Sequence, residues 1–369
     1  MPTTYHPLGR TGLRVSRLAL GAMTFGTEQG WGCDEATSRA LFDRYLEAGG
    51  NFIDTADVYT GGTSERWVGQ FVNERKLRDQ VVIATKYTHN FDKGARNPNG
   101  AGNGRKNLMR ALDASLARLA TDYIDLYYLH TWDQLTPVEE VVRTLDDQVR
   151  AGKIRHYALS DVPAWHASRA TTLAECRGLE APCALQMEYS LVERGIEYEF
   201  TSMSQALGLG LVAWSPLASG LLSGKYQPGT AAEAQNAGRL KTTAKVANPS
   251  LNKFTPRNWE VVAVLESVAK ELGRPMAQVA INWVANRPAV SSVLLGATSL
   301  AQLDQVLPAL DFEIPAELEQ RLDVAGRLAP AFPYAFMDVM GARMHGGAAM
   351  ENKPPRYAER LAGRSGGWR

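Results

Sequence analysis

Short apolar segments alternate along the chain with longer segments of helical spacing. The apolar segments occupy residues 17–21, 51–55, 81–86, 123–130, 154–160, 184–189, 209–215 and 292–296. Most are continuous apolar runs, which is the pattern of strands buried on both faces of a parallel sheet. The order therefore predicts eight strands, each followed by a helical segment.

The segments between these strands carry leucine and valine stripes typical of amphipathic helices. The four stripes are Leu108, Leu112, Leu116 and Leu119; Val138, Val142, Leu145 and Val149; Val261, Leu265, Val268 and Leu272; Leu300, Leu303, Leu307 and Leu310. The run Thr136-Pro137-Val138-Glu139 predicts a capping box with proline at the first helical position. Gly152 marks the predicted end of that helix.

Eight strand–helix units favour an α/β (β/α)₈ TIM barrel over an open doubly wound sheet. The open sheet usually has G-x-G-x-x-G after its first strand, and RLALGAMTFG lacks it; GLGLVA, at 208–213, runs into a strand instead. Residues 5–17 predict a hairpin before the barrel, and 329–369 an irregular C-terminal tail. We expect one domain over 1–369 with a core at about 5–325, and the Gly-rich segment 94–105 is a candidate lid.

Composition excludes several classes of protein. Among 369 residues, 45% are hydrophobic and 21% charged, as in soluble globular proteins. The net charge of +1 gives no field that would attract nucleic acid or a membrane surface, and no apolar run reaches the length of a membrane span. Cys33, Cys176 and Cys183 are far apart and form no C-x-x-C, so we expect a reducing compartment and a cytoplasmic location.

Polar side chains stand at the carboxyl ends of successive predicted strands, where a barrel carries its chemistry. Asp54 and Tyr59 follow the second strand, Lys86 ends the third and His130 the fourth. An ammonium close to a phenol favours the phenolate and lowers the pKa of the tyrosine, and a carboxylate can hold that ammonium in place. A neutral imidazole can then orient a carbonyl group. The set therefore indicates proton transfer to a carbonyl oxygen during hydride transfer.

Each of these residues alone has a structural explanation. Asp54 suits a strand-end cap, Lys86 a solvated strand end or ion pair, and Tyr59 a loop aromatic beside Gly61 and Gly62. His130 alone suits a hydrogen-bonded structural histidine. The six histidines include no H-x-H pair and only His130 stands at a strand end, so no metal site is predicted. Neither G-x-S-x-G nor a P-loop occurs.

Several motifs resemble the aldo-keto reductases, especially their aryl-alcohol dehydrogenase-like and potassium-channel β-subunit-like branch. They are LGRTGLRVSRLALGAMTFG, NFIDTADVY, VVIATK, DYIDLYYLH, AWSPLASGLLSGKY and SSVLLGATSLAQL, in order over residues 5–325. The resemblance implies a (β/α)₈ barrel that binds NADP(H) without a Rossmann domain and reduces an aldehyde or ketone reversibly. It also implies Tyr59 as general acid and base, tuned by Lys86 and Asp54, with His130 orienting the carbonyl.

The resemblance further implies which residues contact the cofactor. Ser160, Asp161 and Gln186 would hold the nicotinamide carboxamide, and Trp214 would stack on the ring. The remaining implied contacts are Ser215, Leu217, Ser219, Gly220, Leu222 and Lys225 at the pyrophosphate, Gly296, Thr298, Gln302 and Gln305 at the adenosine end, and Gly21 and Met23 under the cofactor. Backbone amides near Gly220 and Gly224 are expected to meet phosphate oxygens.

Some positions depart from the family pattern. Asp161 replaces an amide, so when ionised it accepts but does not donate a hydrogen bond. Val306 replaces a common asparagine near the adenine. GATSLAQ lacks the arginine or lysine that many relatives use against the 2′-phosphate. NADP(H) is favoured and NAD(H) stays possible, with Arg239 or Lys241 as candidate partners of the phosphate.

Two functions remain open at this stage: a carbonyl reductase acting on a small molecule, or a cofactor-binding regulatory subunit with slow redox chemistry. The complete tetrad of Asp54, Tyr59, Lys86 and His130 favours the reductase. Trp31, Tyr87 and Trp132, with Phe332 or Tyr334, are candidates for an aromatic pocket that suits a bulky apolar or aromatic carbonyl, although each also suits simple packing. The sequence sets no oligomeric state.

Overall fold

The computed structural model describes residues 4–90, 96–228, 252–344, 346 and 348. Eight parallel strands close a barrel in the order β10-β3-β4-β5-β6-β7-β8-β9. These strands are β3 (Leu18–Gly21), β4 (Phe52–Asp54), β5 (Val82–Tyr87), β6 (Ile124–Leu129), β7 (Ile154–Ser160), β8 (Ala184–Glu188), β9 (Gly210–Trp214) and β10 (Val290–Leu295). The predicted (β/α)₈ barrel is confirmed, with each predicted strand within about two residues of its observed place.

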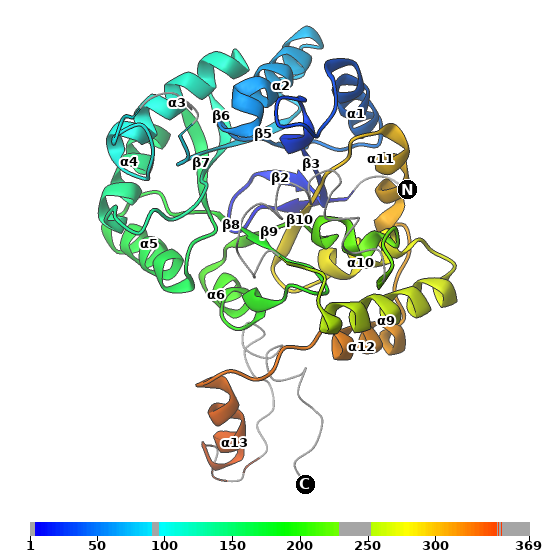
Figure 1. The fold of residues 1–369 in the computed structure, drawn as a ribbon. Helices are drawn as coiled ribbons and strands as arrows, with labels where there is room; N and C mark the ends of the chain where they lie inside the picture. Colours follow the sequence, from blue (N-terminus) through cyan, green and yellow to red (C-terminus); the bar gives the residue numbers. More distant parts are fainter. Residues whose placement is uncertain (1–3, 91–95, 229–251, 345, 347, 349–369) are drawn as a thin grey trace.

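Helices surround the barrel as an outer layer (Figure 1). They are α1 (Glu35–Glu47), α2 (Thr63–Glu74), α3 (Arg105–Leu119), α4 (Val138–Arg150), α5 (Ala164–Arg177), α6 (Phe200–Leu207), α9 (Pro256–Leu272), α10 (Met276–Ala285), α11 (Leu300–Val306) and α12 (Ala316–Ala325). The helix α13 (Tyr334–Met344) stands outside this ring (Figure 1). Because parallel strands need a crossover, the helical segments between consecutive strands return the chain to the same end of the barrel.

The predicted hairpin is confirmed and closes the amino-terminal end of the barrel. Its strands β1 (Tyr5–Pro7) and β2 (Arg14–Ser16) pair antiparallel. Leu8 and Val15 of this hairpin are fully buried and join the cluster that fills the barrel interior, which includes Phe52, Leu126 and Tyr128. The carboxyl-terminal ends of the strands, where this fold carries its functional side chains, lie at the opposite end.

The hydrophobic core has two layers because strand side chains alternate between the two faces of the sheet. On β5, Val82 and Ala84 point into the barrel, whereas Ile83 and Tyr87 pack against the helices. Both faces are covered, which explains why the strand sequences are continuous apolar runs.

Two helix predictions need correction. α4 begins at Val138 with Pro137 as its cap residue and no capping side chain, so the predicted capping box is absent. The hydroxyl of Thr136 instead donates to Asp133 Oδ2 at 2.6 Å, because this aspartate accepts hydrogen bonds from the turn before the helix. The predicted end at Gly152 is confirmed, since this residue follows α4 with φ of 74°.

The last predicted stripe does not form one α-helix. α11 ends at Val306, and Leu307–Leu310 is the 3₁₀ turn η7. Pro308 has no N–H to continue the α-helical ladder, which explains the break. Leu300 is 41% exposed rather than part of a buried stripe.

The candidate lid at 94–105 is only partly described, because residues 94 and 95 lie outside the described residues. Its far end is fixed by Asn103, whose side-chain amide donates to Thr88 Oγ1 at 2.8 Å and to the Thr131 carbonyl at 3.0 Å. Arg105 already belongs to α3. Closure of this segment over the site stays a prediction.

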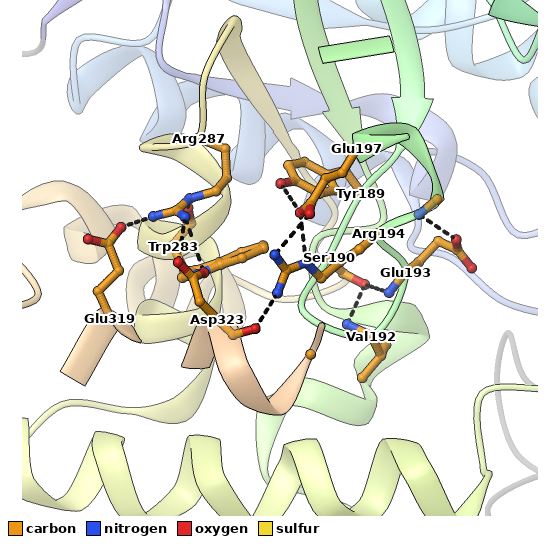
Figure 2. A network of polar contacts seen from close by, with 12 residues as sticks. Tyr189, Ser190, Val192, Glu193, Arg194, Glu197, Trp283, Arg287, Glu319 and Asp323 are labelled. Carbon is orange, nitrogen blue, oxygen red and sulfur yellow. Dashed lines mark hydrogen bonds and ion pairs between the residues drawn. The ribbon is translucent and has the colours of Figure 1, made fainter. Parts of the chain in front are cut away.

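A partly buried polar network ties α12 to α10 and to the turn that follows β8 (Figure 2). The indole N–H of Trp283 donates to Asp323 Oδ1 at 2.8 Å. The guanidinium groups of Arg287 and Arg194 lie 4.6 and 4.9 Å from the Trp283 ring centroid. Arg287 also pairs with Glu319 and Asp323 of α12. These contacts hold the last helix of the ring against α10 and the turn that follows β8.

Candidate active site

The carboxyl ends of β4, β5 and β6 bring the four predicted catalytic residues together. Asp54 is the last residue of β4 and pairs in register with Ala84, two residues before Lys86 on β5. His130 directly follows β6, and its amide donates to the Tyr87 carbonyl at 2.9 Å. Parallel register therefore places these side chains at one end of the barrel.

Lys86 is the centre of this group. Its ammonium forms an ion pair with Asp54 Oδ1 and donates to the Thr55 carbonyl at 2.8 Å and to the Tyr59 hydroxyl oxygen at 3.4 Å. Burial alone lowers the pKa of Lys86, but the charges of Asp54 and Tyr59 offset this and raise the pKa above its ordinary value. Lys86 is fully buried and remains an ammonium at neutral pH.

Tyr59 is presented by a tight turn, η2 (Tyr59–Gly62). Thr60, Gly61 and Gly62 all have positive φ, of 48°, 62° and 89°. Glycine adopts this left-handed backbone without strain, which explains the Gly-Gly pair in the sequence. The Thr60 hydroxyl donates to the Phe25 carbonyl at 2.7 Å, so the loop after β3 fixes the turn.

His130 lies beside Tyr59, with ring centroids 5.8 Å apart at an interplanar angle of 80°. Burial, with smaller contributions from Lys86 and His89, holds the pKa of His130 well below its ordinary value. The imidazole is therefore neutral at physiological pH and has one N–H to donate.

The predicted nicotinamide contacts gather next to the tetrad. Ser160 ends β7 and Asp161 follows it, while Gln186 lies on β8 and Trp214 ends β9. The Asp161 carboxylate accepts a hydrogen bond from the Trp214 indole N–H at 3.1 Å. Gln186 donates its amide to Asp54 Oδ2 at 2.8 Å, so it supports the carboxylate of the ion pair.

The predicted pyrophosphate loop forms the turn η4 (Ala218–Ser223) after β9. Ser215, Ala218, Ser219 and Gly220 have positive φ, which curls the loop tightly. Within this loop the amides of Gly220 and Leu222 donate to the Leu217 carbonyl at 2.9 and 3.2 Å.

The side chains of this loop differ in how far they are exposed to a bound ligand. Leu222 is fully buried in the core, so it does not face a ligand, whereas Leu217 is partly buried. Lys225 is exposed next to Gly220, where a cation suits a phosphate. The Ser219 amide donates to Ser215 Oγ at 3.3 Å. That backbone amides near Gly220 and Gly224 meet phosphate oxygens stays a prediction, and the Gly220 amide itself already donates within the loop.

The predicted adenosine-end residues lie around the start of α11. Gln302 Oε1 accepts hydrogen bonds from the Thr298 amide and hydroxyl at 2.9 and 3.1 Å. Gln305 is exposed, and Gly296 is exposed between β10 and Thr298. Gly21 is the last residue of β3, and Met23 lies in the 3₁₀ turn that follows it. The candidate cations Arg239 and Lys241 lie outside the described residues.

The structure separates the three predicted pocket aromatics. Tyr87 is fully buried between the barrel and the helices and stacks on Tyr127, so the prediction that it lines the pocket is wrong. Trp31 is half-buried in the loop that supports the Tyr59 turn. Trp132, two residues after His130, is half-buried and contacts Trp165 edge-on.

Trp132 and Trp165 line a recess of about 230 Å³ between the starts of α4 and α5. A larger hollow of about 490 Å³ lies between α9 and α12 on the outer helix layer and contains none of the predicted site residues. Phe332 is 84% exposed, and the Tyr334 hydroxyl donates to Glu199 Oε1 at 2.7 Å. Neither side chain is seen to line a pocket beside the four predicted catalytic residues.

Sequence reasoning missed a buried charge cluster behind the Tyr59 turn. Glu65 of α2 is fully buried, accepts from the Thr85 hydroxyl at 2.6 Å and pairs with Arg118 of α3 at 2.5 Å. Asp57 is buried nearby, and burial followed by the Glu65 charge raises the pKa of Asp57 well above its ordinary value. The only available signal was a glutamate within an apolar helix face.

A second missed pair joins Lys253 to Glu188 at the end of β8, with Nζ and Oε1 3.0 Å apart. The residues are far apart in sequence, so no spacing rule predicts their contact.

Among the described residues, no three histidine, cysteine, aspartate or glutamate side chains gather as a metal-binding group. Within the same residues, no helix is long and apolar enough to cross a membrane.

Comparison with known proteins now adds to this geometry. The model of the Aldo/keto reductase family matches residues 17–326. The chain belongs to the aldo/keto reductase family. Membership makes it an NAD(P)H-dependent oxidoreductase, and the predicted resemblance is confirmed.

Several relatives come from the branch expected from the sequence. A probable voltage-gated potassium channel subunit beta of Oryza sativa is 39% identical, over 83% of this chain and 91% of the relative. Norsolorinic acid reductase B of Aspergillus parasiticus is 33% identical, over 88% and 84% of the two chains. An aryl-alcohol dehydrogenase of Pestalotiopsis microspora is 32% identical, over 89% and 83%.

Proposed function

We propose that this aldo/keto reductase reduces an aldehyde or ketone to the alcohol, reversibly, with Tyr59 as the proton donor. One observation carries the proposal: the Lys86 ammonium lies between Asp54 and the Tyr59 hydroxyl, 3.4 Å from the phenol oxygen. A buried cation at that place stabilises the phenolate left after proton transfer. Asp54, supported by Gln186, keeps the ammonium charged and in position.

The residues beyond the tetrad fit a nicotinamide dinucleotide. Trp214 offers an aromatic face that Asp161 fixes in place, and Lys225 stands beside the tight turn at Gly220. When bound, the reduced cofactor supplies the hydride that reaches the carbonyl carbon. NADP(H) is our preferred cofactor on the family resemblance.

Within this proposal, His130 orients the substrate. Its neutral ring donates one hydrogen bond to the carbonyl oxygen, which then lies between His130 and the Tyr59 hydroxyl. A protonated histidine there would repel Lys86, so the lowered pKa of His130 suits the role. Such general acid–base assistance contributes roughly 10²–10⁴-fold to the rate.

We propose an aromatic carbonyl compound as substrate. Trp132, two residues after His130, borders a recess together with Trp165, and we propose that this recess receives the aryl group. The names of two relatives, an aryl-alcohol dehydrogenase and a norsolorinic acid reductase, point the same way. We also place the protein in the cytoplasm, where its three free cysteines remain reduced.

Tyr59→Phe tests the proton donor. The variant keeps the ring but loses the hydroxyl, so reduction of an aromatic aldehyde should fall at least 100-fold. The dissociation constant for NADPH, followed by Trp214 quenching, should change less than about threefold. Wild-type turnover in the variant would reject the mechanism.

A cofactor-binding regulatory subunit is the second candidate, favoured by the 39% identity to a probable channel β subunit. A panel of aromatic and aliphatic carbonyls separates the two functions. Turnover below about one per minute on every compound, with tight cofactor binding, would support the regulatory function; faster turnover on any aromatic aldehyde supports the reductase.

A further inference from the structure

Asp161 is rigidly placed beside the proposed nicotinamide site. It adopts a left-handed backbone with φ of 46°, which aspartate and asparagine tolerate better than most residues. Its amide donates to the Gln186 carbonyl at 3.3 Å, and its carbonyl accepts from the Trp132 amide at 3.4 Å. The backbone is thus held by β8 and by the loop after β6.

The side chain of Asp161 is fixed as well. Its Oδ1 accepts a hydrogen bond from the Trp214 indole N–H at 3.1 Å. Because Trp214 is the proposed platform for the nicotinamide ring, the Asp161 carboxylate lies next to that ring rather than at the phosphates.

The charged groups nearest Asp161 form ion pairs of their own. Lys86 pairs with Asp54, and Lys253 pairs with both Glu188, at 3.0 Å, and Glu193, at 3.4 Å. Among the described residues, no cation lies within ion-pair distance of Asp161. When ionised, Asp161 therefore places one negative charge, hydrogen-bonded but without a counter-ion, beside the proposed position of the ring.

We propose that Asp161 makes this protein bind the oxidised, positively charged nicotinamide in preference to the reduced, neutral one. The inference rests on the proposed cofactor site. The two cofactor forms share the same phosphates and adenosine, so the ring charge is the term that separates them. A carboxylate held close to a cation in a partly dry site lowers the free energy of the oxidised complex. An amide at this position would supply no such charge.

Acid should remove the preference. Burial, partly opposed by the Trp214 hydrogen bond, raises the pKa of Asp161 to about 6, with Glu188 raising it and Lys86 and Ser160 lowering it. A proton on Asp161 removes the charge that attracts the oxidised ring. The preference is then complete above pH 6 and is lost as the pH falls below it.

The test compares Asp161→Asn with wild type by calorimetric titration of NADP⁺ and NADPH at pH 7.5 and pH 5.0. At pH 7.5, the ratio of the NADP⁺ dissociation constant to the NADPH constant should rise about tenfold in the variant, equivalent to about 1.4 kcal/mol. At pH 5.0, wild type and variant should give similar ratios. Taking the ratio cancels titration of the cofactor phosphates.

Two further variants make the result specific. Trp214→Phe removes the indole donor but keeps the carboxylate, so a preference for NADP⁺ at pH 7.5 should remain. Asp113→Asn, on the exposed side of α3, makes the same chemical change far from the site and should leave the ratio unchanged. Thermal melting verifies that each variant is folded.

The outcomes separate the inference from the proposed function. A ratio at pH 7.5 that is equal in wild type and Asp161→Asn overturns the role of Asp161 while leaving the reductase intact. Wild type that binds neither cofactor form overturns the proposed function, and the inference with it.

Discussion

At the residue scale, the site depends on charges that are buried together. Lys86 is fully buried, and its contacts with Asp54, the Thr55 carbonyl and Tyr59 replace the water it lost. Removing one member of such a pair leaves the other charge buried alone, which costs more than the pair itself contributes. The same contacts that prepare Tyr59 therefore also stabilise the fold.

Asp54→Asn should lower the free energy of unfolding by about 3 kcal/mol, because the ammonium of Lys86 loses its buried counter-charge. Urea denaturation at pH 7 measures this. The exposed pair of Asp113 and Lys153 provides a matched control, since Asp113→Asn should cost less than about 1 kcal/mol. Equal losses in the two variants would show that burial of the first pair does not matter.

The pKa of Lys86 also predicts the pH range of this stability. Because the folded pKa lies above the ordinary value, the contribution is complete at neutral pH and is lost only as alkali passes the raised pKa.

Asp161→Asn should stabilise the folded state at pH 7. The pKa of Asp161 is raised from an ordinary 3.8 to about 6, so ionising this group costs folding free energy as the pH rises between those values. Each pKa unit is worth about 1.4 kcal/mol, and removing the carboxylate should recover up to about 3 kcal/mol. Urea denaturation should show the gain at pH 7 and none below pH 4; a gain of equal size at both would contradict the assignment.

At the element scale, two helices position the turn that carries Tyr59. α2 begins directly after the Tyr59 turn, and its buried Glu65 pairs with Arg118 of α3. The Cβ that a side chain would add at Gly62 lies 2.7 Å from the Arg118 side chain, so this arginine packs under the turn. The orientation of Tyr59 thus depends on the contact between α2 and α3.

Arg118→Met should destabilise the protein by about 3–5 kcal/mol, since the buried Glu65 carboxyl would lose its ion-pair partner near Asp57. It should also lower turnover while leaving the cofactor dissociation constant unchanged, because the turn moves but Trp214 does not. Arg321→Met is the control: in the ion pair of Arg321 with Glu271 the two side chains are 38% and 47% exposed, so its loss should cost less than about 1 kcal/mol. An unaltered turnover in a folded Arg118 variant would reject the positioning role.

The hydrophobic periodicity of the sequence predicted that these strands and helices exist better than it predicted the residues at which they begin and end. The strand runs predicted all eight barrel strands, because burial on both faces demands apolar residues throughout. Helix starts were less certain: Asp133, outside the predicted motif, accepts the hydrogen bonds of the turn before α4. Whether Asp133 or the predicted capping residue Thr136 accepts hydrogen bonds there depends on the positions of the atoms in the turn, which a motif does not contain.

At the scale of the whole molecule, contacts between distant segments close and brace the barrel. β10 pairs with β3, so the last strand joins the first, and the Ser292 hydroxyl donates to the Ser16 carbonyl at 2.8 Å. The network of Figure 2 then fastens α12 through Asp323, which contacts both Trp283 and Arg287.

Asp323→Ala should lower the free energy of unfolding by about 2–3 kcal/mol, because the buried Trp283 N–H loses its acceptor and Arg287 one of its partners. Thermal melting at pH 7 provides the measurement. Asp311→Ala, at an exposed position after η7, should change stability by less than about 0.5 kcal/mol. Carbonyl reductase turnover should be retained in both variants, and a loss confined to Asp323→Ala would connect this network to the site.

The sequence by itself determined the barrel, its hairpin and the strand ends at which Asp54, Lys86 and His130 lie. The spacing of apolar residues within each short segment is enough to predict a strand or a helix and its buried side. Only the tertiary structure decided which side chains are in contact. Gln186 donates a hydrogen bond to Asp54, and Trp214 donates one to Asp161. Tyr87 packs between the barrel and the helices. The tertiary structure also decided the pairs of Glu65 with Arg118 and Glu188 with Lys253. Such contacts join segments far apart in the chain, and their energies depend on distance and burial, which no local pattern encodes.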